Sequence, residues 1–133
     1  MIGLDTNVLA RYIVRDDKKQ TAAATRLIEA QCTEESPGFV SLLVLAELFW
    51  VLSRGYGYQK AVLVTVFTKL LSAVELRIET ADDAWTALRA YRDGPAELAD
   101  YLIALRARAN GCETIATFDR KAARSALHTL VPS

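Results

Sequence analysis

The sequence has no long uninterrupted apolar run. Its most apolar stretch, residues 39–52, is broken by Ser41 and Glu47, whereas a membrane-spanning helix needs roughly 18 apolar residues in succession. Residues 1–4 lead directly to Asp5 without the basic region, long apolar core and cleavage site of a signal peptide. We therefore expect a cytoplasmic protein that does not use a membrane as a partner.

The sequence also contains few cysteine and histidine residues and carries no net charge. Cys32 and Cys112 lack any partner spacing, so neither a zinc site nor a disulfide framework is indicated, and we interpret both as reduced structural thiols. His128, the only histidine, lies in a strand-like apolar context that favours a structural role. With 16 basic and 16 acidic residues the net charge is zero, so nucleic-acid binding would require a local basic patch.

Motifs for several other chemistries are missing as well. The sequence has no glycine-rich phosphate loop, no nucleophile elbow and no Cys-His pairing, so nucleotide-triphosphate chemistry and covalent acyl transfer lack support. What is present is a composition of 52% hydrophobic and 24% charged residues over 133 positions, which excludes disorder and fits one domain. We expect a single domain over residues 1–133.

Apolar periodicity predicts alternating strands and helices. A first helix follows Asp5, and Ser41 is placed to cap a long one. Strands are expected at 1–4, 39–40, 74–78, 114–117 and 127–131, and further helices at 18–30, 42–54, 59–72, 81–92, 97–109 and 120–126. Helices between short apolar strands predict an α/β fold of three α/β/α layers, with a parallel sheet of about four to five strands.

Two acids lie just past the carboxyl ends of predicted parallel strands. Asp5 follows the first strand and Asp119 follows strand 114–117, which places both at the sheet edge where open α/β folds bind ligands. Each is equally well explained, taken alone, as a helix N-cap.

Two further acids interrupt apolar helices. Glu47 is the only ionisable residue between Phe39 and Leu52, and a buried carboxylate requires a compensating cation, either Lys or Arg or a metal. Asp100 interrupts an apolar helix in the same way. Its alternative explanation is an ion pair with Arg106 or Arg108 on a solvated face.

Together the four acids predict one shared acidic pocket, whose mutual repulsion a divalent cation would relieve. Oxygen ligands favour Mg²⁺ or Mn²⁺ over zinc, and such a metal suits phosphodiester hydrolysis. Thr6 and Thr117 could orient metal-bound water, although capping and strand propensity explain each about as well. Basic residues that follow Asp5 and Asp119 are candidates for holding RNA phosphates, or else form solvated faces: Arg11, Arg15, Arg120, Lys121 and Arg124.

An ordered set of motifs resembles the PIN-domain family, and most closely its VapC-type toxin branch. The resemblance covers essentially the whole chain and rests on Ile2-Gly3-Leu4-Asp5-Thr6-Asn7-Val8-Leu9, the Glu47 helix, Ala99-Asp100 with Leu102-Ile103-Ala104, and Thr117-Phe118-Asp119. It implies a parallel sheet between helices, Mg²⁺- or Mn²⁺-dependent endonucleolytic cleavage of RNA, and a small antitoxin as partner in a type II toxin-antitoxin pair.

The resemblance also implies roles for individual residues. Asp5 and Asp100 resemble the most direct metal ligands, Glu47 and Asp119 complete the acidic quartet, and Thr117 resembles the hydroxyl near the fourth acid. Two departures leave all four acids in place: Tyr101 stands where relatives often have a small residue, and Leu98 replaces a frequent aromatic. The Tyr101 side chain puts the shape of the pocket in doubt.

The leading hypothesis is thus a toxin endoribonuclease. The alternatives are a catalytically silent module that binds RNA or a partner protein, and a PIN nuclease outside any toxin-antitoxin pair. The high apolar content suggests an exposed patch. We expect the helical hairpin of residues 42–54 and 59–72 to dock the antitoxin and to take part in a homodimer.

Overall fold

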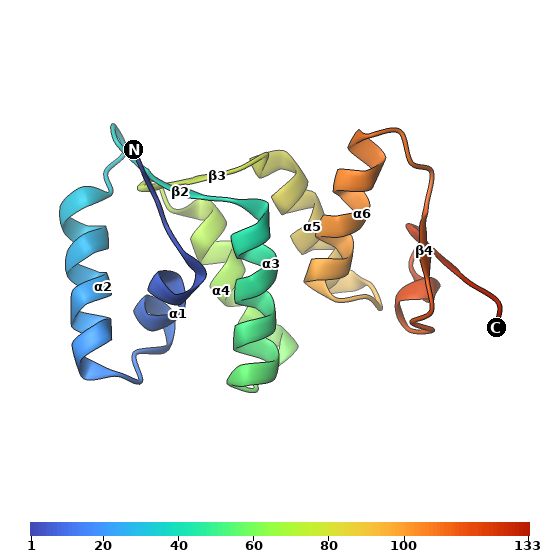
Figure 1. Ribbon diagram of the computed structural model, residues 1–133, viewed down its shortest axis with the longest axis horizontal. Helices are drawn as coiled ribbons and strands as arrows, with labels where there is room; N and C mark the ends of the chain where they lie inside the picture. The colour runs from blue at the N-terminus through green and yellow to red at the C-terminus, as the bar shows by residue number, and fades with distance from the viewer. The chain divides into compact units, whose positions relative to one another are not determined.

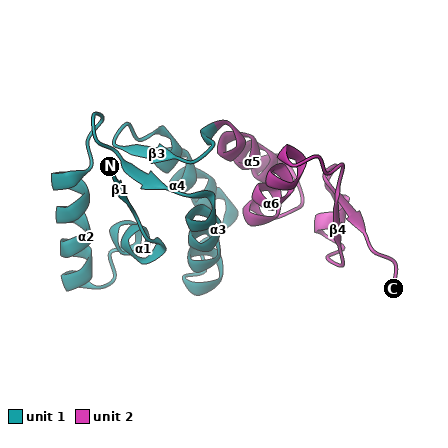
Figure 2. Ribbon diagram, turned by 45° about the horizontal axis from the view of Figure 1, so that its top comes forward, with its two compact units in different colours: residues 1–81 teal, residues 82–133 magenta.

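The computed structural model describes all residues, 1–133 (Figure 1). The chain forms two compact units, Met1–Ala81 and Asp82–Ser133 (Figure 2), which are described separately below. Six helices alternate with short, parallel-paired strands, which confirms the predicted α/β class. None of the helices combines the length and the apolar character needed to span a bilayer.

The first unit contains a three-stranded parallel sheet. Its strands β1 (Ile2–Gly3), β2 (Gly38–Val40) and β3 (Leu76–Ile78) lie in the order β1-β2-β3. The ladder continues past the strand ends, where the Leu4 N–H donates to the Phe39 carbonyl at 2.9 Å. Parallel pairing brings the carboxyl ends of all three strands to one edge of the sheet, so the residues that follow the strands share that edge.

Four helices and a π-helical segment complete the first unit. Helix α1 (Thr6–Val14) packs against α2 (Lys18–Gln31) and against α3 (Leu42–Trp50). The helix predicted at 42–54 has the expected extent, but its last turn, Val51–Gly55, is a π-helix. Helix α4 (Lys60–Ser72) contacts both β3 and this π-helical segment.

Short polar side chains fix where these helices begin. The Asp5 carboxylate accepts the Thr6 N–H, Asp17 Oδ1 accepts the Gln20 N–H at 2.9 Å, and Ser41 Oγ accepts the Val44 N–H at 3.1 Å. Each bond satisfies a backbone donor that has no partner within the helix. Ser41 follows β2 directly and Asp5 follows β1 after Leu4, so both helices start at the carboxyl edge of the sheet.

Close packing holds the elements of the first unit. The largest fully buried side chains all belong to it: Phe49, Phe67, Leu9, Leu45, Leu48, Leu52, Leu63 and Val40. Full burial of such a side chain contributes roughly 1.5–3 kcal/mol. Helices α1 and α3, which carry the first two candidate acids, therefore have little freedom to shift.

The second unit contains α5 (Ala81–Asp93), α6 (Leu98–Ala109), β4 (Ile115–Thr117) and β5 (His128–Leu130). The two strands pair in parallel, with Ile115 opposite His128. The five strands of the chain are thus divided between a three-stranded and a two-stranded sheet. The expectation of a single domain over residues 1–133 stays a prediction.

The prediction of a helix at 120–126 is wrong, because only a 3₁₀ turn, Ala122–Arg124, forms there. The chain leaves helical geometry at Ser125, which is extended. The Ser125 hydroxyl bonds to the His128 ring and also accepts the Leu127 N–H. A serine side chain that offers the backbone such bonds competes with helix continuation, which explains the early end.

Candidate active site

Asp5 lies at the carboxyl edge of the first sheet, as predicted. It follows Leu4 and is exposed, and its Oδ1 accepts the Thr6 N–H at 2.6 Å. The alternative explanation, an N-cap of α1, is therefore correct as a description of this contact. A cap uses one carboxylate oxygen, and exposure leaves the Asp5 carboxylate accessible to a ligand.

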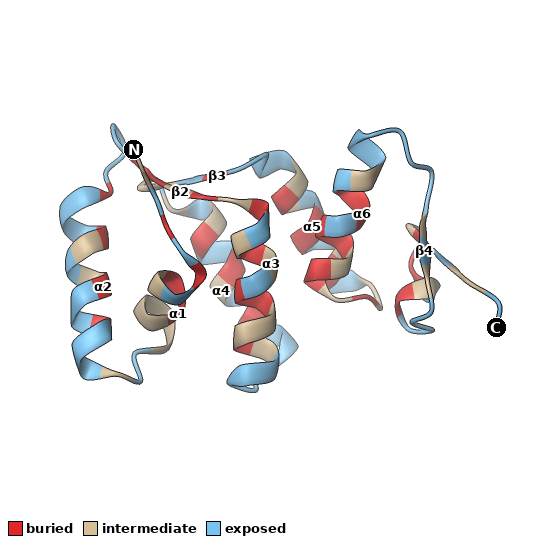
Figure 3. Cartoon of the chain, viewed as in Figure 1, coloured by how far each residue is buried: buried red, intermediate tan, exposed pale blue.

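The interpretation of Glu47 as a buried carboxylate is wrong, because its side chain is exposed. Helix α3 has buried and exposed residues along its length (Figure 3). It buries Leu45, Leu48 and Phe49, while Leu43 and Glu47, one turn apart, are exposed. The surrounding apolar residues thus do not enclose Glu47. No buried charge has to be compensated, and burial no longer argues for a metal at this residue.

A different observation connects Glu47 to the sheet edge. The Thr6 hydroxyl, on a residue that is only 5% exposed, donates to Glu47 Oε1 at 3.0 Å. The backbone N–H of the same residue binds Asp5. Thr6 therefore links the first two acids, from β1–α1 and from α3, although they are 42 positions apart in the sequence (47 − 5).

Glu79 is a third acid at this edge, and sequence reasoning missed it. Its N–H donates to the Val40 carbonyl at 2.9 Å, and its Oε1 accepts the Leu42 N–H at 2.9 Å. The position directly after strand β3 was the available signal, the same one that identified Asp5. The contact with Leu42 gives Glu79 a structural role as an additional cap of α3.

Asp100 lies in the first turn of α6 and is half-buried. Its Oδ2 accepts the Glu97 N–H at 3.0 Å, the contact of an N3 acid in a capping box. The ion pair considered for Asp100 does not form with Arg106, whose guanidinium lies 4.0 Å from Asp83. The local explanation of Asp100 is therefore a helix cap.

Asp119 is exposed and follows β4, as predicted. Its Oδ1 accepts the N–H groups of Lys121, at 2.8 Å, and of Ala122, at 3.2 Å. The Asp119 N–H in turn donates to Thr117 Oγ1 at 3.0 Å. The Thr117 hydroxyl therefore binds the backbone of Asp119, and this hydrogen bond stabilises the turn between β4 and the 3₁₀ helix.

The four acids fall into two pairs, one in each unit. Asp5 and Glu47 are joined through Thr6. In the second unit an ion pair of 3.5 Å between Lys121 and Glu97 ties the turn after Asp119 to the start of α6, three residues before Asp100. Within neither unit do three or more His, Cys, Asp or Glu side chains gather closely enough to hold a metal. The convergence of the two pairs stays a prediction.

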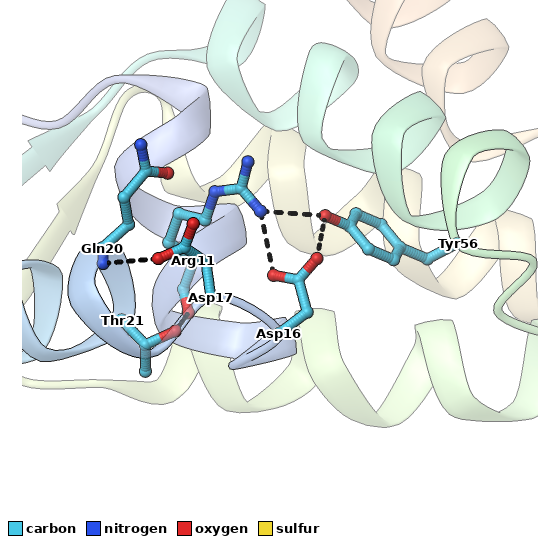
Figure 4. Close-up of polar contacts among 6 residues, drawn as sticks. All are labelled: Arg11, Asp16, Asp17, Gln20, Thr21 and Tyr56. Carbon is cyan, nitrogen blue, oxygen red and sulfur yellow. Dashed lines mark hydrogen bonds and ion pairs between the residues drawn. The ribbon is translucent and has the colours of Figure 1, made fainter.

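Among the basic candidates, Arg11 already has protein partners (Figure 4). One guanidinium nitrogen donates to Asp16 at 2.9 Å and to the Tyr56 hydroxyl at 3.2 Å, and that hydroxyl donates to Asp16 at 2.9 Å. The Tyr56 hydrogen bond and the Arg11 guanidinium lower the pKa of Asp16 below its ordinary value. Arg11 would have to leave this ion pair to bind a phosphate.

The other four basic candidates are exposed: Arg15, Arg120, Lys121 and Arg124. Arg15 ends α1 in the left-handed conformation, with φ of 61°, and its guanidinium lies 5.7 Å from the Tyr12 ring centroid. Lys121 pairs with Glu97. Contact of these residues with RNA stays a prediction.

Tyr101, whose bulk put the pocket shape in doubt, is a core residue. It is buried, its hydroxyl accepts the Ala96 N–H at 3.4 Å, and its ring lies edge-on to the His128 ring. His128 is buried as well, which agrees with its structural interpretation. Of the two free thiols, Cys32 is buried and Cys112 is exposed, so only Cys32 fits the structural role expected of both.

The donor chemistry around the acids suits a hard divalent cation. Asp5 and Glu47 present exposed carboxylates beside the Thr6 hydroxyl, and Asp119 is exposed beside Thr117. The only histidine is buried against Ser125 and Tyr101, which leaves oxygen as the ligand type. Oxygen ligands fit Mg²⁺ or Mn²⁺ better than zinc.

Comparison with known proteins gives one match. No curated protein and no solved structure matches the chain. The family model described as PIN domain matches residues 2–126, a span that includes all four acids. PIN domains are typically metal-dependent nucleases. The chain belongs to the PIN-domain family.

Proposed function

We propose that this protein is a Mg²⁺- or Mn²⁺-dependent endoribonuclease that hydrolyses RNA phosphodiester bonds. The observation that carries the proposal is the bridge made by Thr6 at the carboxyl edge of a parallel sheet: its N–H donates to the Asp5 carboxylate and its hydroxyl donates to Glu47. The family match over residues 2–126 supports it. In the active enzyme Asp100 and Asp119 would complete the site.

Each residue has a defined task in this proposal. Asp5 and Asp100 bind the cation directly, while Glu47 and Asp119 complete its carboxylate environment. A bound divalent cation supplies a water of lowered pKa and stabilises the leaving oxygen. Thr6 holds Glu47 in place through its hydroxyl, and Thr117 holds the backbone of Asp119. The exposed Arg120 and Arg124 are available to hold flanking phosphates.

The test is cleavage of a single-stranded RNA, compared with DNA of the same sequence, with Mg²⁺, with Mn²⁺ and with excess EDTA. We expect RNA cleavage that EDTA stops and added metal restores. Asp5→Asn and Asp100→Asn should each abolish it, because each removes a ligand charge. Asp82→Asn, which changes an exposed acid in the first turn of α5, serves as the matched control and should cleave normally.

Circular dichroism and thermal unfolding would establish that the variants fold. Cleavage retained by both Asp5→Asn and Asp100→Asn would refute the proposed site. RNA binding by the wild type without metal-dependent cleavage would instead support a catalytically silent module. Cleavage of DNA alone would refute the substrate class.

We further propose the toxin role, with a small antitoxin docking on the hairpin of α3 and α4. Two large apolar side chains are exposed there, Leu43 at 79% and Val62 at 48%, and Leu43 lies one helical turn before Glu47. A segment seated on Leu43 would lie beside the acidic site and could block it. The same hairpin is the candidate surface for a homodimer.

Co-expression with the product of a short neighbouring reading frame tests this role. A stable complex that elutes together in size-exclusion chromatography and suppresses RNA cleavage is expected, and Leu43→Asp should weaken it. A strict monomer whose activity no neighbouring product suppresses would contradict both the antitoxin and the homodimer.

A further inference from the structure

Beyond the acids, the end of α3 and the π-helical segment that follows it carry an aromatic residue and a basic residue. Leu43, Glu47, Trp50 and Arg54 follow one another at intervals of four, three and four residues, a spacing that places side chains on one side of a helix. At a rise of about 1.5 Å per residue, Trp50 lies about 4.5 Å beyond Glu47 along the helix axis. The pair Trp50 and Arg54 is called the stacking pair below.

The stacking pair has a specific geometry. The Arg54 guanidinium carbon lies 4.0 Å from the centroid of the Trp50 ring, and Trp50 is half-buried, in edge-to-face contact with Phe49 at 5.0 Å. Phe49 is fully buried. The indole is therefore anchored on the core, while the guanidinium covers it from the solvent side.

The backbone beneath Arg54 is unusual. The π-helical segment Val51–Gly55 follows α3 without a break, and the Tyr56 N–H donates to the Val51 carbonyl at 3.1 Å. Segments of π-helix are rare and are frequent at functional sites. This segment widens the helix directly after Trp50 and sets the position from which Arg54 reaches back over the ring.

Arg54 makes no ion pair with a carboxylate, whereas Arg11, Arg92 and Arg106 each lie beside one. Its positive charge therefore remains available to an anion. A guanidinium plane stacked on an indole, next to an acidic edge, combines the two features that bind single-stranded RNA: a flat surface for a base and a positive charge for a phosphate.

We propose that Trp50 and Arg54 bind the RNA nucleotide that flanks the cleaved bond on the Glu47 side of the site. Its base stacks on the pair, and its phosphate contacts the Arg54 guanidinium. This inference rests on the proposed ribonuclease function, since it assigns a substrate position within that site. Stacking tolerates any base, so the pair positions the strand without reading its sequence.

The fluorescence of Trp50 gives a direct test that does not depend on cleavage. Trp85→Phe removes the only other tryptophan, which leaves Trp50 as the sole reporter. The full chain in this background is titrated with a short single-stranded RNA in EDTA, so that no cleavage occurs, and total binding is followed in parallel by anisotropy of labelled RNA. We expect the Trp50 emission to change with the same affinity as the anisotropy.

Substitutions then separate stacking from charge. Arg54→Ala should weaken binding by about tenfold, as loss of one stacked contact predicts, and Arg54→Lys should restore only part of it because the flat guanidinium is missing. Arg26→Ala, at an exposed arginine of α2, is the matched control and should bind as the parent does. Because Trp50→Leu removes half-buried packing, Arg54→Ala is the decisive variant.

Four outcomes would overturn the proposal. RNA binding with an unchanged Trp50 signal, or equal affinities of Arg54→Ala and Arg26→Ala, would overturn the stacking pair and leave the ribonuclease function standing. A Trp50 signal that changes with protein concentration in the absence of RNA would show that this face binds a second copy of the chain instead. RNA bound by no form of the protein, with or without metal, would overturn the proposed function together with the inference.

Discussion

Thr6 is the residue on which the geometry of the first acidic pair depends. It is buried, its hydroxyl donates to the exposed Glu47 carboxylate, and its N–H donates to Asp5. Thr6→Val keeps the shape and removes the donor. We expect a loss of about 1 kcal/mol of stability and an RNA cleavage rate lowered by roughly 10- to 100-fold, the effect of losing a group that orients a metal ligand.

Thr6→Ser is the matched variant, because it restores the hydroxyl, and it should recover most of the activity. Chemical denaturation and initial cleavage rates measure the two effects. Equal cleavage by Thr6→Val and the wild type would mean that the orientation of Glu47 does not matter for the reaction.

The raised pKa of Tyr91 leads us to expect that the protein loses stability at alkaline pH. Burial, and secondarily the charge of Glu97, raise the pKa of Tyr91 from 10.0 to about 12. The folded state thus favours the neutral phenol. The resulting contribution to the free energy of unfolding is on the order of 2 kcal/mol. It is fully present below pH 10 and is lost as the pH rises through 12.

Denaturant unfolding between pH 8 and pH 12 tests this expectation. The wild type should lose stability more steeply above pH 10 than Tyr91→Phe, which has no proton to release. Parallel curves for the two proteins would contradict the assigned pKa.

At the residue scale, the sequence predicted the positions of the acids better than it predicted their surroundings. Asp5 and Asp119 were predictable because a residue after a parallel strand lies at the sheet edge. The exposure of Glu47 was not predictable, because apolar neighbours such as Leu43 are themselves exposed. A periodic pattern does not specify which apolar residues face solvent. The bond from Thr6 to Glu47 depends on the packing of α1 against α3, which no local pattern contains.

At the scale of elements, the turn into β2 shows how closely the first unit is packed. A side-chain carbon placed on Gly38 would come within 2.8 Å of both Cys32 Sγ and Leu4 Cδ1. Gly38→Ala must therefore displace the side chain of Cys32 or of Leu4. We expect a loss of about 1–3 kcal/mol and lower cleavage activity, because Leu4 precedes Asp5.

Gly3→Ala is the control for this prediction, since nothing lies within 4 Å of the added carbon. Thermal unfolding should separate the two variants by several degrees. Identical melting temperatures would show that the Leu4 and Cys32 side chains can move aside without a loss of stability.

Helix starts were predictable from the sequence, and helix ends were less so. Ser41 caps α3 as expected because a serine before an apolar run is a local signal. The π-helical segment and the early end of the predicted helix 120–126 have other causes. In both places other hydrogen bonds replace the regular α-helical ones: the Tyr56 N–H donates to the Val51 carbonyl in the π-helical pattern, and the Leu127 N–H donates to the Ser125 hydroxyl.

At the scale of the whole molecule, the four candidate acids are divided between the two units. Asp5 and Glu47 belong to residues 1–81, and Asp100 and Asp119 belong to residues 82–133. The family model spans residues 2–126 and therefore includes residues of both units. The order of the four acids along the chain was available from the sequence, whereas their distribution between two units required the structure.

The central claim is that the two acidic pairs bind one divalent cation together, and binding of Mn²⁺ measured by electron paramagnetic resonance tests it most directly. We expect the wild type to deplete the signal of free Mn²⁺, and Asp5→Asn and Asp100→Asn each to weaken binding by about tenfold or more. The control Asp82→Asn should bind as the wild type does. A wild type that leaves the free signal unchanged, or weakening by only one of the two site variants, would contradict the claim.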